Sequence, residues 1–584
     1  MKQKTFLVSS SIQELVPRQK TKIIFLGKWC FTSINMNRIK NCDYKTLKYH
    51  WKNKKKLEKD YYIIKKLYKI IAKDLCSYLN AVHKKNFSEN YWNQIFGNWL
   101  MEFIIFIYDK YSIVNSLEKD ADYCSYLIGK SEKVIPNTSL EALSLFQDEM
   151  YNHQIFSEIM MKLRPNIKFI KKKKKIINIK KKSLNQKYSF LLKTLSYRLK
   201  KENGNNEIFI LSSYLGLLRE ILLQIKLNGF LRFNFCEEIK RKFQIDFIKR
   251  NIKLKESKSF LRMLKLMVIQ NLPASYLEGY DYVKTLGYKK KWPNNPKKIF
   301  TSVSHLYSDV FKVWLAEKRE KRSKFIVGQH GIGYLVSKFH SQYDLDLARS
   351  DKLIFWGNKK FKDKKIIKGF NFLSRSKINR TKNFYITMVQ KFPHKYLTKL
   401  ISNDYNISTI DQNIKSQKIF LSSLSKKFQN QIKIRYCFSN NFFPDVYNYE
   451  KKYWSDIKDR FKFESRSTPM NKSLKTTKLV ILNSIHSTLF FECLSNDIPC
   501  IIFSNFFSDS FYKEGKKDFK SLQKVGIIHN DPIKLSKFIN KNFENLNSWW
   551  NGREVNRVKK KFIEKYCRFE SNPIKAMSKI LSTC

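Results

Sequence analysis

The chain has 584 residues, of which 43% are hydrophobic, with only 16 Gly and 12 Pro. A single core stops growing near about 250 to 300 residues, so this length predicts two large domains. The composition excludes a disordered or fibrous protein. The formal net charge of +65 would suit a polyanion partner. Because the lysines run along the whole chain and no nucleic-acid-binding motif accompanies them, we expect no specific nucleic-acid partner.

One dense basic run occupies residues 171–182 (KKKKKIINIKKK). It is either a solvated connector between two helical segments or a patch that contacts the anionic headgroups of a membrane surface. These two interpretations stay open.

The sequence lacks the signals of a secreted or membrane-spanning protein. Residues 1–10 lack the apolar core of a signal peptide, and the most apolar stretch, residues 99–108, is interrupted by Glu102. No membrane span is therefore predicted. The ten cysteines form no C-x-x-C pair, which predicts neither a zinc site nor a disulfide framework. We expect a cytoplasmic protein, with peripheral contact at the inner membrane as the further option.

Short apolar runs predict a first α/β lobe over residues 1–373. Residues 22–27 (KIIFLG) indicate its opening strand, and further strands are expected at residues 207–211, 298–303, 324–328 and 352–357. Between residues 54 and 117 apolar side chains recur at three- and four-residue spacing, which predicts long helices. We expect a large helical insertion over about residues 45–200.

A second series of strands predicts a C-terminal α/β lobe over residues 374–584. Its strands are expected at residues 383–389, 432–438, 478–482 and 499–503, and the boundary between the lobes at residues 374–382. Strands separated by helices imply parallel sheets. The predicted fold class is therefore α/β with two Rossmann-like lobes. An amphipathic helix at residues 554–568 is expected to cross back to the first lobe.

The first candidate site follows the strand at residues 324–328, in the segment Gln329-His330-Gly331-Ile332-Gly333-Tyr334. Glycines allow a tight turn and close approach to a ligand beyond the carboxyl end of a strand, where open α/β sheets bind ligands. An imidazole with a pKa near neutrality can remove a proton from an attacking hydroxyl, so His330 is the candidate general base. The alternative is a histidine that only bonds a neighbouring loop.

The second candidate site follows the strand at residues 478–482. Ser487 and Thr488 stand at the start of a predicted helix, whose free N–H groups can bind phosphate. Glu492 lies one turn later on the same face and could accept hydrogen bonds from ribose hydroxyls. Ordinary helix capping is the alternative for the two hydroxyl residues. His486 is a further candidate phosphate contact.

Arg435, on the strand at residues 432–438, could neutralise a donor phosphate if its side chain reaches the cleft between the lobes. It could equally be a surface arginine. No Asp-x-Asp follows a strand in the manner of metal-dependent transferases, since Asp344-Leu-Asp346 stands in another context. We therefore expect a reaction that needs neither a metal nor a cofactor.

Four segments carry a resemblance over nearly the whole chain: LVSSSIQEL with IIFLGKWC near the start, YWNQIFGNWL at residues 91–100, KFIVGQHGIGY at residues 324–334, and SWWNGREVNRVKKKFIEKYC at residues 548–567. They resemble a family of bacterial transferases associated with O-antigen and surface-polysaccharide biosynthesis. More distantly, the His-Gly loop and the Ser-Thr-x-x-x-Glu helix are similar to the pairing in CDP-glycerol glycerophosphotransferases and capsule sialyl- or Kdo-type transferases. Where that pattern has glycines, this chain has Ile332 and Leu335.

The resemblance implies a GT-B-like enzyme that transfers a sugar or sugar-like group. It implies a nucleotide-sugar donor held by the C-terminal lobe and a lipid-linked or saccharide acceptor on the N-terminal lobe. Two other functions remain open: a non-catalytic scaffold of a polysaccharide assembly complex, and a basic nucleic-acid-binding protein.

Overall fold

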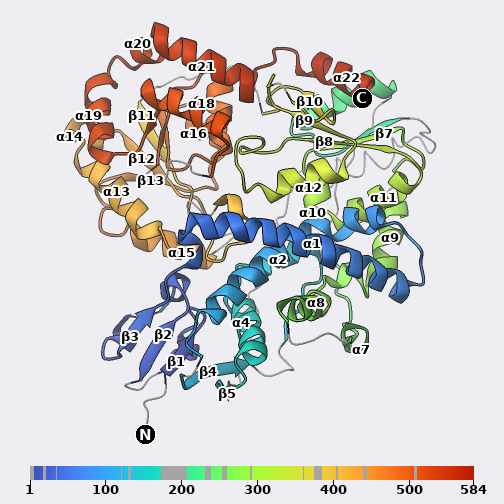
Figure 1. Cartoon of the computed structure of the whole chain (residues 1–584). Helices are drawn as coiled ribbons and strands as arrows, with labels where there is room; N and C mark the ends of the chain where they lie inside the picture. Colours follow the sequence, from blue (N-terminus) through green and yellow to red (C-terminus); the bar gives the residue numbers. More distant parts are fainter. Residues whose placement is uncertain are drawn as a thin grey trace.

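The computed structural model describes residues 5–17, 21–34, 36–119, 121–128, 133–172, 207–230, 239–252, 259–289, 292–359, 361–373, 384–402, 406–438, 444–504 and 510–584. Three parallel sheets, each covered by helices, organise them (Figure 1). The expected boundary at residues 374–382 lies outside the described residues. So does most of the basic run, of which only Lys171 and Lys172 are described.

The N-terminal sheet has the strand order β3-β2-β1-β4-β5. Its strands are β1 (Thr5–Val8), β2 (Lys22–Phe25), β3 (Tyr44–Thr46), β4 (Tyr123–Ile128) and β5 (Lys168–Lys172). The central sheet has the order β10-β9-β8-β7-β6. It contains β6 (Ile208–Ile210), β7 (Lys298–Thr301), β8 (Lys324–Gly328), β9 (Lys352–Phe355) and β10 (Ile366–Lys368).

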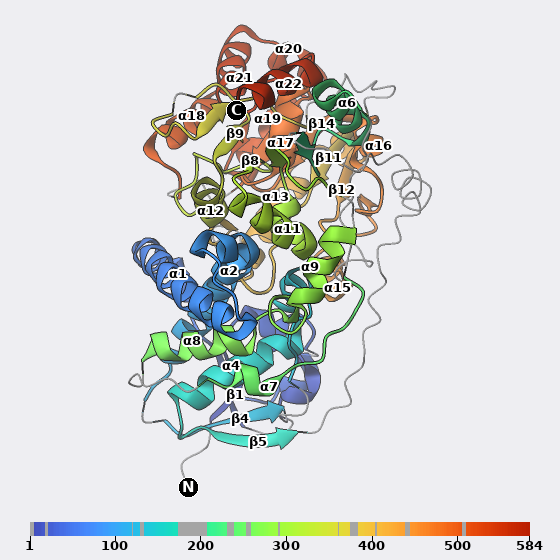
Figure 2. The ribbon, with the colours of Figure 1, turned by 90° about the vertical axis from the view of Figure 1, so that its right-hand side faces the viewer.

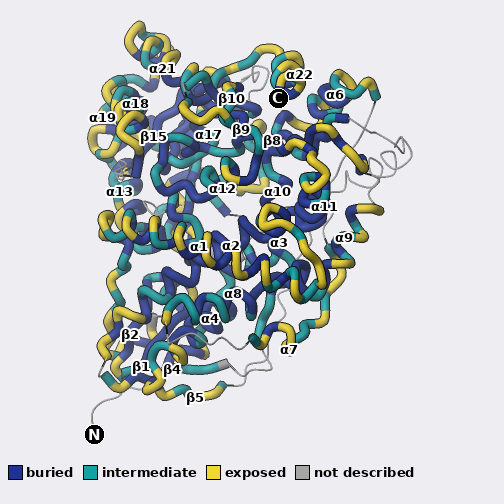
Figure 3. The backbone as a smooth tube through the Cα atoms, turned by 45° about the vertical axis from the view of Figure 1, so that its right-hand side comes forward, coloured by how far each residue is buried: buried dark blue, intermediate teal, exposed yellow. Residues whose placement is uncertain are grey.

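The C-terminal sheet has the order β13-β12-β11-β14-β15-β16. It contains β11 (Tyr385–Val389), β12 (Ile432–Arg435), β13 (Lys462–Glu464), β14 (Thr477–Leu482), β15 (Cys500–Phe503) and β16 (Ile528–His529). The inner strands of the central and C-terminal sheets are buried, as expected for parallel strands covered on both faces (Figure 3). The predicted α/β class with Rossmann-like lobes is confirmed.

Two long helices, α1 (Lys54–His83) and α2 (Glu89–Asn115), cross the middle of the molecule between the N-terminal sheet and the other two (Figure 1). The side chains of Asn53 and Ser88 cap them. The helices that follow, up to the end of the central sheet, are α3 (Ser139–Leu145), α4 (Glu149–Leu163), α6 (Leu217–Asn228), α7 (Phe247–Arg250), α8 (Phe260–Gln270), α9 (Tyr280–Lys289), α10 (Ser304–Tyr307), α11 (Asp309–Glu320) and α12 (Ser341–Arg349).

The C-terminal sheet is covered by the helices α13 (Ile410–Ser422), α14 (Lys426–Gln429), α15 (Pro444–Tyr453), α16 (Met470–Leu474), α17 (Thr488–Ser495), α18 (Lys513–Lys524), α19 (Pro532–Asn542), α20 (Leu546–Trp550) and α21 (Arg553–Tyr566). Short 3-10 turns complete the described chain, at Gln13–Leu15, Lys28–Phe31, Met36–Ile39, His50–Lys52, Ala274–Tyr276 and Leu400–Ser402.

The end of the chain returns to the central sheet, as analogy with other two-lobed folds predicts. The Arg568 backbone N–H, two residues past α21, donates to the Trp356 carbonyl (2.8 Å). The last helix, α22 (Pro573–Thr583), packs beside α6 (Figure 2). The Lys298 ammonium on β7 donates to the Leu581 carbonyl (2.7 Å) and so ties this helix to the sheet.

The structure of residues 45–200 differs from the helical insertion that was expected there. It contains β4 and β5, which complete a separate N-terminal sheet, so the strands expected in the first lobe belong to two sheets. β5 is an edge strand with no buried residue, and its sequence, KFIKK, has no long apolar run. The strand β1 was not predicted either.

A buried histidine lies beside the N-terminal sheet, and its protonation opposes folding. His153 on α4 is 2% exposed, and its Nδ1 pairs with the Ser9 hydroxyl (2.7 Å). Burial lowers the pKa of His153 to about 4, below the value of about 6.5 for a solvated histidine. The unfolded chain therefore binds this proton more readily than the folded chain.

We expect the free energy of unfolding to fall as the pH is lowered from about 6.5 to about 4, with His153 contributing about 1.4 kcal/mol per pH unit. His153→Gln should flatten this slope by about that amount, as measured by urea unfolding at a series of pH values. Equal slopes for the variant and the native chain would show that His153 takes no part.

Candidate functional site

Gln329, directly after β8, shapes the His-Gly loop from within. Its backbone N–H donates to the Ile354 carbonyl (2.9 Å), and its side chain accepts from the Trp356 N–H (2.9 Å) and donates to the Gly331 carbonyl (2.8 Å). The side chain is fully buried. Gln329 therefore fixes the loop on the neighbouring strand β9 and does not face a ligand.

His330, the candidate base, ends a chain of hydrogen bonds. The Tyr334 hydroxyl lies 2.9 Å from His330 Nδ1 and donates to Asp346 Oδ2 (2.6 Å). Because an ionised carboxylate can only accept, the hydroxyl proton points at Asp346. His330 Nδ1 must then carry the proton that the Tyr334 oxygen accepts. This tautomer leaves the lone pair on Nε2, which is the arrangement that a general base requires.

Asp346 on α12 is a buried hub of this chain. His305 Nε2 lies 2.9 Å from Oδ1, and Gln342 Nε2 donates to the same oxygen (2.6 Å). The guanidinium of Arg349 lies 3.8 Å away. Burial alone would raise the pKa of Asp346, but His305 first, and then His330 and Arg349, hold it well below its usual range. The carboxylate is ionised, and its role was not apparent from the sequence.

The pKa of His330 differs from the expected value near neutrality. Burial lowers it to about 3, although Asp346 acts in the opposite direction. His330 is neutral at physiological pH, so its Nε2 lone pair is free to accept a proton. A nearby anion would raise the pKa and make the base stronger.

The loop conformation depends on Gly333 and Leu335. Gly333 has φ +103°, and a methyl group there would lie 2.6 Å from Ile401 Cδ1. Leu335 has φ +60°, the left-handed conformation that glycine adopts most readily. The position therefore keeps the backbone of the glycine found in the similar transferases, although the residue has changed.

The second candidate site lies at the start of α17. Ser487 occupies the N-cap position, yet its side chain makes no capping hydrogen bond. The Phe490 N–H donates to the Ser487 carbonyl (3.0 Å), which leaves the N–H groups of Thr488 and Leu489 suited to an anion. Both ring nitrogens of His486 are buried without a partner among the described residues. Burial, followed by the charge of Lys391, lowers the pKa of His486 well below its usual value.

The structure brings the two candidate sites together. A methyl group on Gly331 would lie 3.6 Å from Thr488 Oγ1, so the His-Gly loop and the start of α17 face each other. Strand β8 positions the first and β14 the second, and both lie beyond the carboxyl ends of their strands. Asn371, after the central sheet, also donates to the Ser495 hydroxyl at the end of α17 (2.8 Å).

Arg435 does not reach this cleft. Its side chain is 5% exposed and donates to Glu464 Oε2 (2.6 Å) and to the carbonyls of Arg466 (3.2 Å) and Thr468 (2.6 Å). The prediction of a phosphate contact is therefore wrong, because the guanidinium N–H groups of Arg435 donate to Glu464 and to the backbone carbonyls that follow β13. Glu492 lies partly exposed on α17, one turn after Thr488.

Three cations that the sequence analysis did not single out act on histidines of this region. The backbone N–H of Lys391, after β11, donates to Asn483 Oδ1 (2.6 Å), which joins the ends of β11 and β14. Lys391 and Arg466 both act on the pKa of His394, which lies exposed beside Phe438. Lys399 acts on the pKa of His330. Of these cations, Lys399 is paired with Glu102 (3.3 Å).

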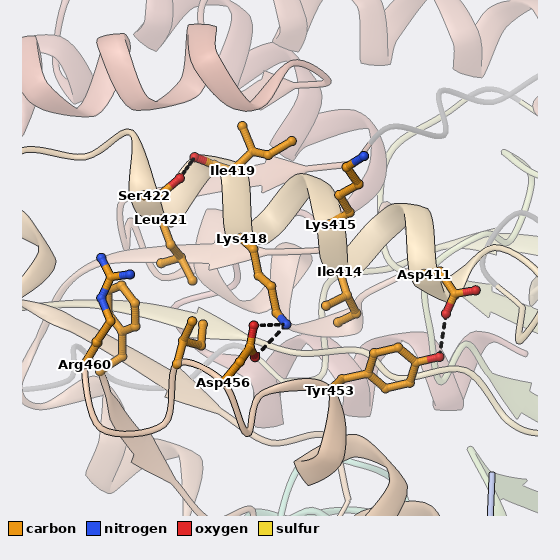
Figure 4. Close-up of a pocket in the computed structure, with 12 residues that line it drawn as sticks. Asp411, Ile414, Lys415, Lys418, Ile419, Leu421, Ser422, Tyr453, Asp456 and Arg460 are labelled. Atoms are coloured by element: carbon orange, nitrogen blue, oxygen red, sulfur yellow. Dashed lines mark hydrogen bonds and ion pairs between the residues drawn. The ribbon is translucent and has the colours of Figure 1, made fainter. Parts of the chain in front are cut away.

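The site is marked neither by a metal cluster of the described residues nor by the groove drawn in Figure 4. Within the described part of the chain, no group of three or more His, Cys, Asp or Glu side chains is arranged to hold a metal ion. A groove of about 470 Å³ lies between α13 and the segment after α15 (Figure 4). Lys418 pairs with Asp456 across it (2.7 Å), and no candidate site residue lines it. No described helix is both long and apolar enough to cross a membrane.

The two loop glycines should respond differently to alanine. Gly333→Ala places a methyl group in a left-handed backbone against Ile401, so we expect a loss of about 1 to 3 kcal/mol in the free energy of unfolding. Gly331→Ala makes only an ordinary contact with Thr488 and should change this free energy by less than about 0.5 kcal/mol. Urea unfolding of both variants checks this contrast, and equal losses would contradict the loop geometry.

The chain is similar to several solved structures at low sequence identity. The chain is 14% identical to TarM over 49% of its own length and 54% of TarM, with a TM-score of 0.30, so it spans about half of that protein. It is 10% identical to the wall teichoic acid polymerase TagF (52% and 84% covered, TM-score 0.30). It is 12% identical to Alr3699/HepE from Anabaena, solved with UDP and glucose (53% and 83% covered, TM-score 0.31).

No curated protein matches the chain. The family model described as LIC12162 family transferase matches residues 5–581, which is almost the whole sequence. The expectation of an enzyme of the transferase class is thereby confirmed, and the chain belongs to the LIC12162 family of transferases.

Proposed function

We propose that this transferase moves a glycosyl or similar group from a nucleotide-activated donor to a hydroxyl of a saccharide or lipid-linked acceptor. The observation that carries the proposal is the apposition of His330, with its free Nε2 lone pair, and the uncapped start of α17. A base on one lobe and an anion site on the other are the two parts that such a transfer needs. The assignment to surface-polysaccharide assembly in the cytoplasm rests on the resemblance of the sequence motifs.

The donor diphosphate would bind at the start of α17. The N–H groups of Thr488 and Leu489, with the hydroxyls of Ser487 and Thr488, can donate to its oxygens. Lys391 and Arg466 would supply the positive charge that the sequence had suggested for Arg435. His486, with two unpartnered ring nitrogens, can add one hydrogen bond. Glu492 would accept from the ribose, one turn along the helix.

The acceptor would react beside His330 on the central sheet. Its hydroxyl oxygen attacks the transferred group, the bond to the diphosphate breaks, and the nucleoside diphosphate leaves with the electron pair. His330 Nε2 takes the hydroxyl proton. The imidazolium that forms still donates from Nδ1 to Tyr334 and lies in the field of ionised Asp346. The bound diphosphate also raises the pKa of His330, so the base strengthens once the donor is in place.

The two lobes should separate catalysis from donor binding. His330→Ala should lower kcat by about 10²- to 10⁴-fold and leave nucleotide affinity nearly unchanged, because it removes only the proton acceptor. Thr488→Ala should mainly weaken nucleotide binding, by about three- to tenfold. His529→Ala is the matched control. His529 lies on β16, and its ring is hydrogen-bonded to the Gly526 carbonyl.

Thermal shift with CMP, CDP, UDP and GDP species identifies the nucleotide, and turnover of the matching donor sugar gives kcat. Loss of nucleotide binding in His330→Ala but not in Thr488→Ala would reverse the proposed roles of the lobes. If none of these nucleotides stabilises the native chain, the proposed transfer from a nucleotide-activated donor is wrong.

Tyr334 would act as a positioning residue for His330. Tyr334→Phe removes the hydroxyl that fixes the tautomer, so kcat should fall by about 10- to 100-fold while KM for the donor stays constant. A purely structural role would raise KM as well or lower the melting temperature. Steady-state kinetics with donor varied, together with a melting curve, distinguish these outcomes.

A further inference from the structure

A small pocket opens beside the His330 chain of hydrogen bonds, between parts of the molecule far apart in sequence. Helix α2 contributes Asn98, Trp99 and Glu102, and the remaining lining residues are Ser139, Leu143, Leu306, Tyr307, Gln342 and Lys399. Its free volume is about 10 Å³, which admits a group about the size of one water molecule. Lys399 comes from the segment after β11, so the pocket joins the N-terminal helices to both lobes.

The polar floor of the pocket is joined directly to the Asp346 hub. Gln342 Nε2 donates to Asp346 Oδ1 (2.6 Å) and lies 3.2 Å from Asn98 Oδ1. Asn98 Nδ2 donates to the His305 carbonyl (2.9 Å), and Arg349 donates to Asn98 Oδ1 (2.5 Å). These groups are satisfied by one another. They fix the place of the pocket relative to the candidate base.

Other groups around the pocket can form hydrogen bonds with a ligand. Trp99 is 2% exposed, and its indole N–H has no hydrogen-bond partner among the described residues. A buried donor without a partner is costly, so such a group calls for a water molecule or a ligand atom. Glu102 is buried and pairs with Lys399 (3.3 Å). Glu102 above all raises the pKa of Lys399, so the Lys399 ammonium is charged.

This arrangement also accounts for Asn98 in the motif YWNQIFGNWL, and for Glu102 two residues after the motif, on a helix whose residues are mostly buried. Asn98 fixes the hub, while Trp99 and Glu102 line the pocket (Figure 2 shows α2 beside α12). Packing alone would need none of these polar atoms. A helix outside the paired lobes thus supplies part of the wall of the cleft.

We propose that this pocket receives one hydroxyl group of the acceptor sugar, an inference that rests on the proposed function. The Trp99 indole N–H donates to the oxygen of that group, and Glu102 accepts its proton. The pocket holds a single substituent, so the sugar ring itself stays in the cleft, where another of its hydroxyls can meet His330 Nε2. Tyr307, which is 41% exposed, presents aromatic surface to the apolar face of the ring.

The chemistry of the lining favours a hydroxyl over a charged substituent. A hydroxyl both donates and accepts, which matches one indole donor and one carboxylate acceptor. A carboxylate or phosphate substituent would meet Glu102, whose charge repels it. An apolar substituent would leave the Trp99 N–H unpaired.

The test uses the full-length chain saturated with the nucleotide diphosphate that stabilises it, or without nucleotide if none does. The probes are methyl β-glycosides of glucose, galactose and mannose, with the 6-deoxy and other monodeoxy derivatives of each. Ligand-observed saturation-transfer NMR gives a Kd for each glycoside. We expect one parent glycoside to bind and one of its deoxy derivatives to bind about three- to tenfold more weakly.

Trp99→Phe and Glu102→Gln should each weaken the parent glycoside by a similar three- to tenfold factor and leave the weaker deoxy derivative unaffected. Trp292→Phe is the matched control, since Trp292 is also buried with an unpartnered indole N–H but lies against Phe209 and Trp314, behind the central sheet. If Trp99→Phe does not fold, Glu102→Gln alone decides the result.

Two outcomes would overturn the inference. Either no glycoside binds, or the parent glycoside binds equally well to the native chain and to both pocket variants. With nucleotide binding intact, these outcomes leave the proposed function standing. Absence of nucleotide binding would remove the proposed function, whereas glycoside binding that depends on Trp99 and Glu102 would still establish the pocket.

Discussion

The buried, ionised carboxylate of Asp346 is the constraint on which the candidate site depends. Burying a lone carboxylate is costly, so the fold must surround it with donors. His305, Gln342 and Tyr334 provide them from α10, α12 and the His-Gly loop. The Tyr334 hydroxyl donates its proton to Asp346, so His330 must carry its own proton on Nδ1. One buried charge therefore determines which nitrogen of the candidate base faces the reaction.

The N-terminal third of the chain supports this arrangement from outside the paired lobes. Helix α2 reaches the hub through Asn98 and reaches Lys399 through Glu102. Glu149 on α4 binds the C-terminal lobe through the Lys395 ammonium (2.8 Å) and the Tyr396 hydroxyl (3.0 Å). The segment after β11 is thus held from two sides. Since this segment carries Lys399, the N-terminal helices and sheet influence the charge and shape of the cleft.

Much of the architecture could be predicted because apolar runs are a strong signal for buried parallel strands. The strands β7, β8, β9, β11, β14 and β15 all lie where such runs predict them. The spacing of apolar residues likewise predicted α1 and α2. The edge strand β5 has no buried residue and no apolar run to mark it, and the separate N-terminal sheet escaped prediction. Local patterns do not reveal which strands share a sheet.

The sequence by itself determined that the chain is a two-lobed α/β protein, with a His-Gly loop after one strand and a Ser-Thr helix start after another. Only the tertiary structure decided that Gly331 and Thr488 face each other, because they lie far apart in the chain and on different sheets. It also decided that Arg435 is occupied by Glu464 and the carbonyls that follow it. The same holds for Asp346, whose partners come from separate segments. A side chain's role follows from what surrounds it after folding, and that environment is set by contacts that no local pattern records.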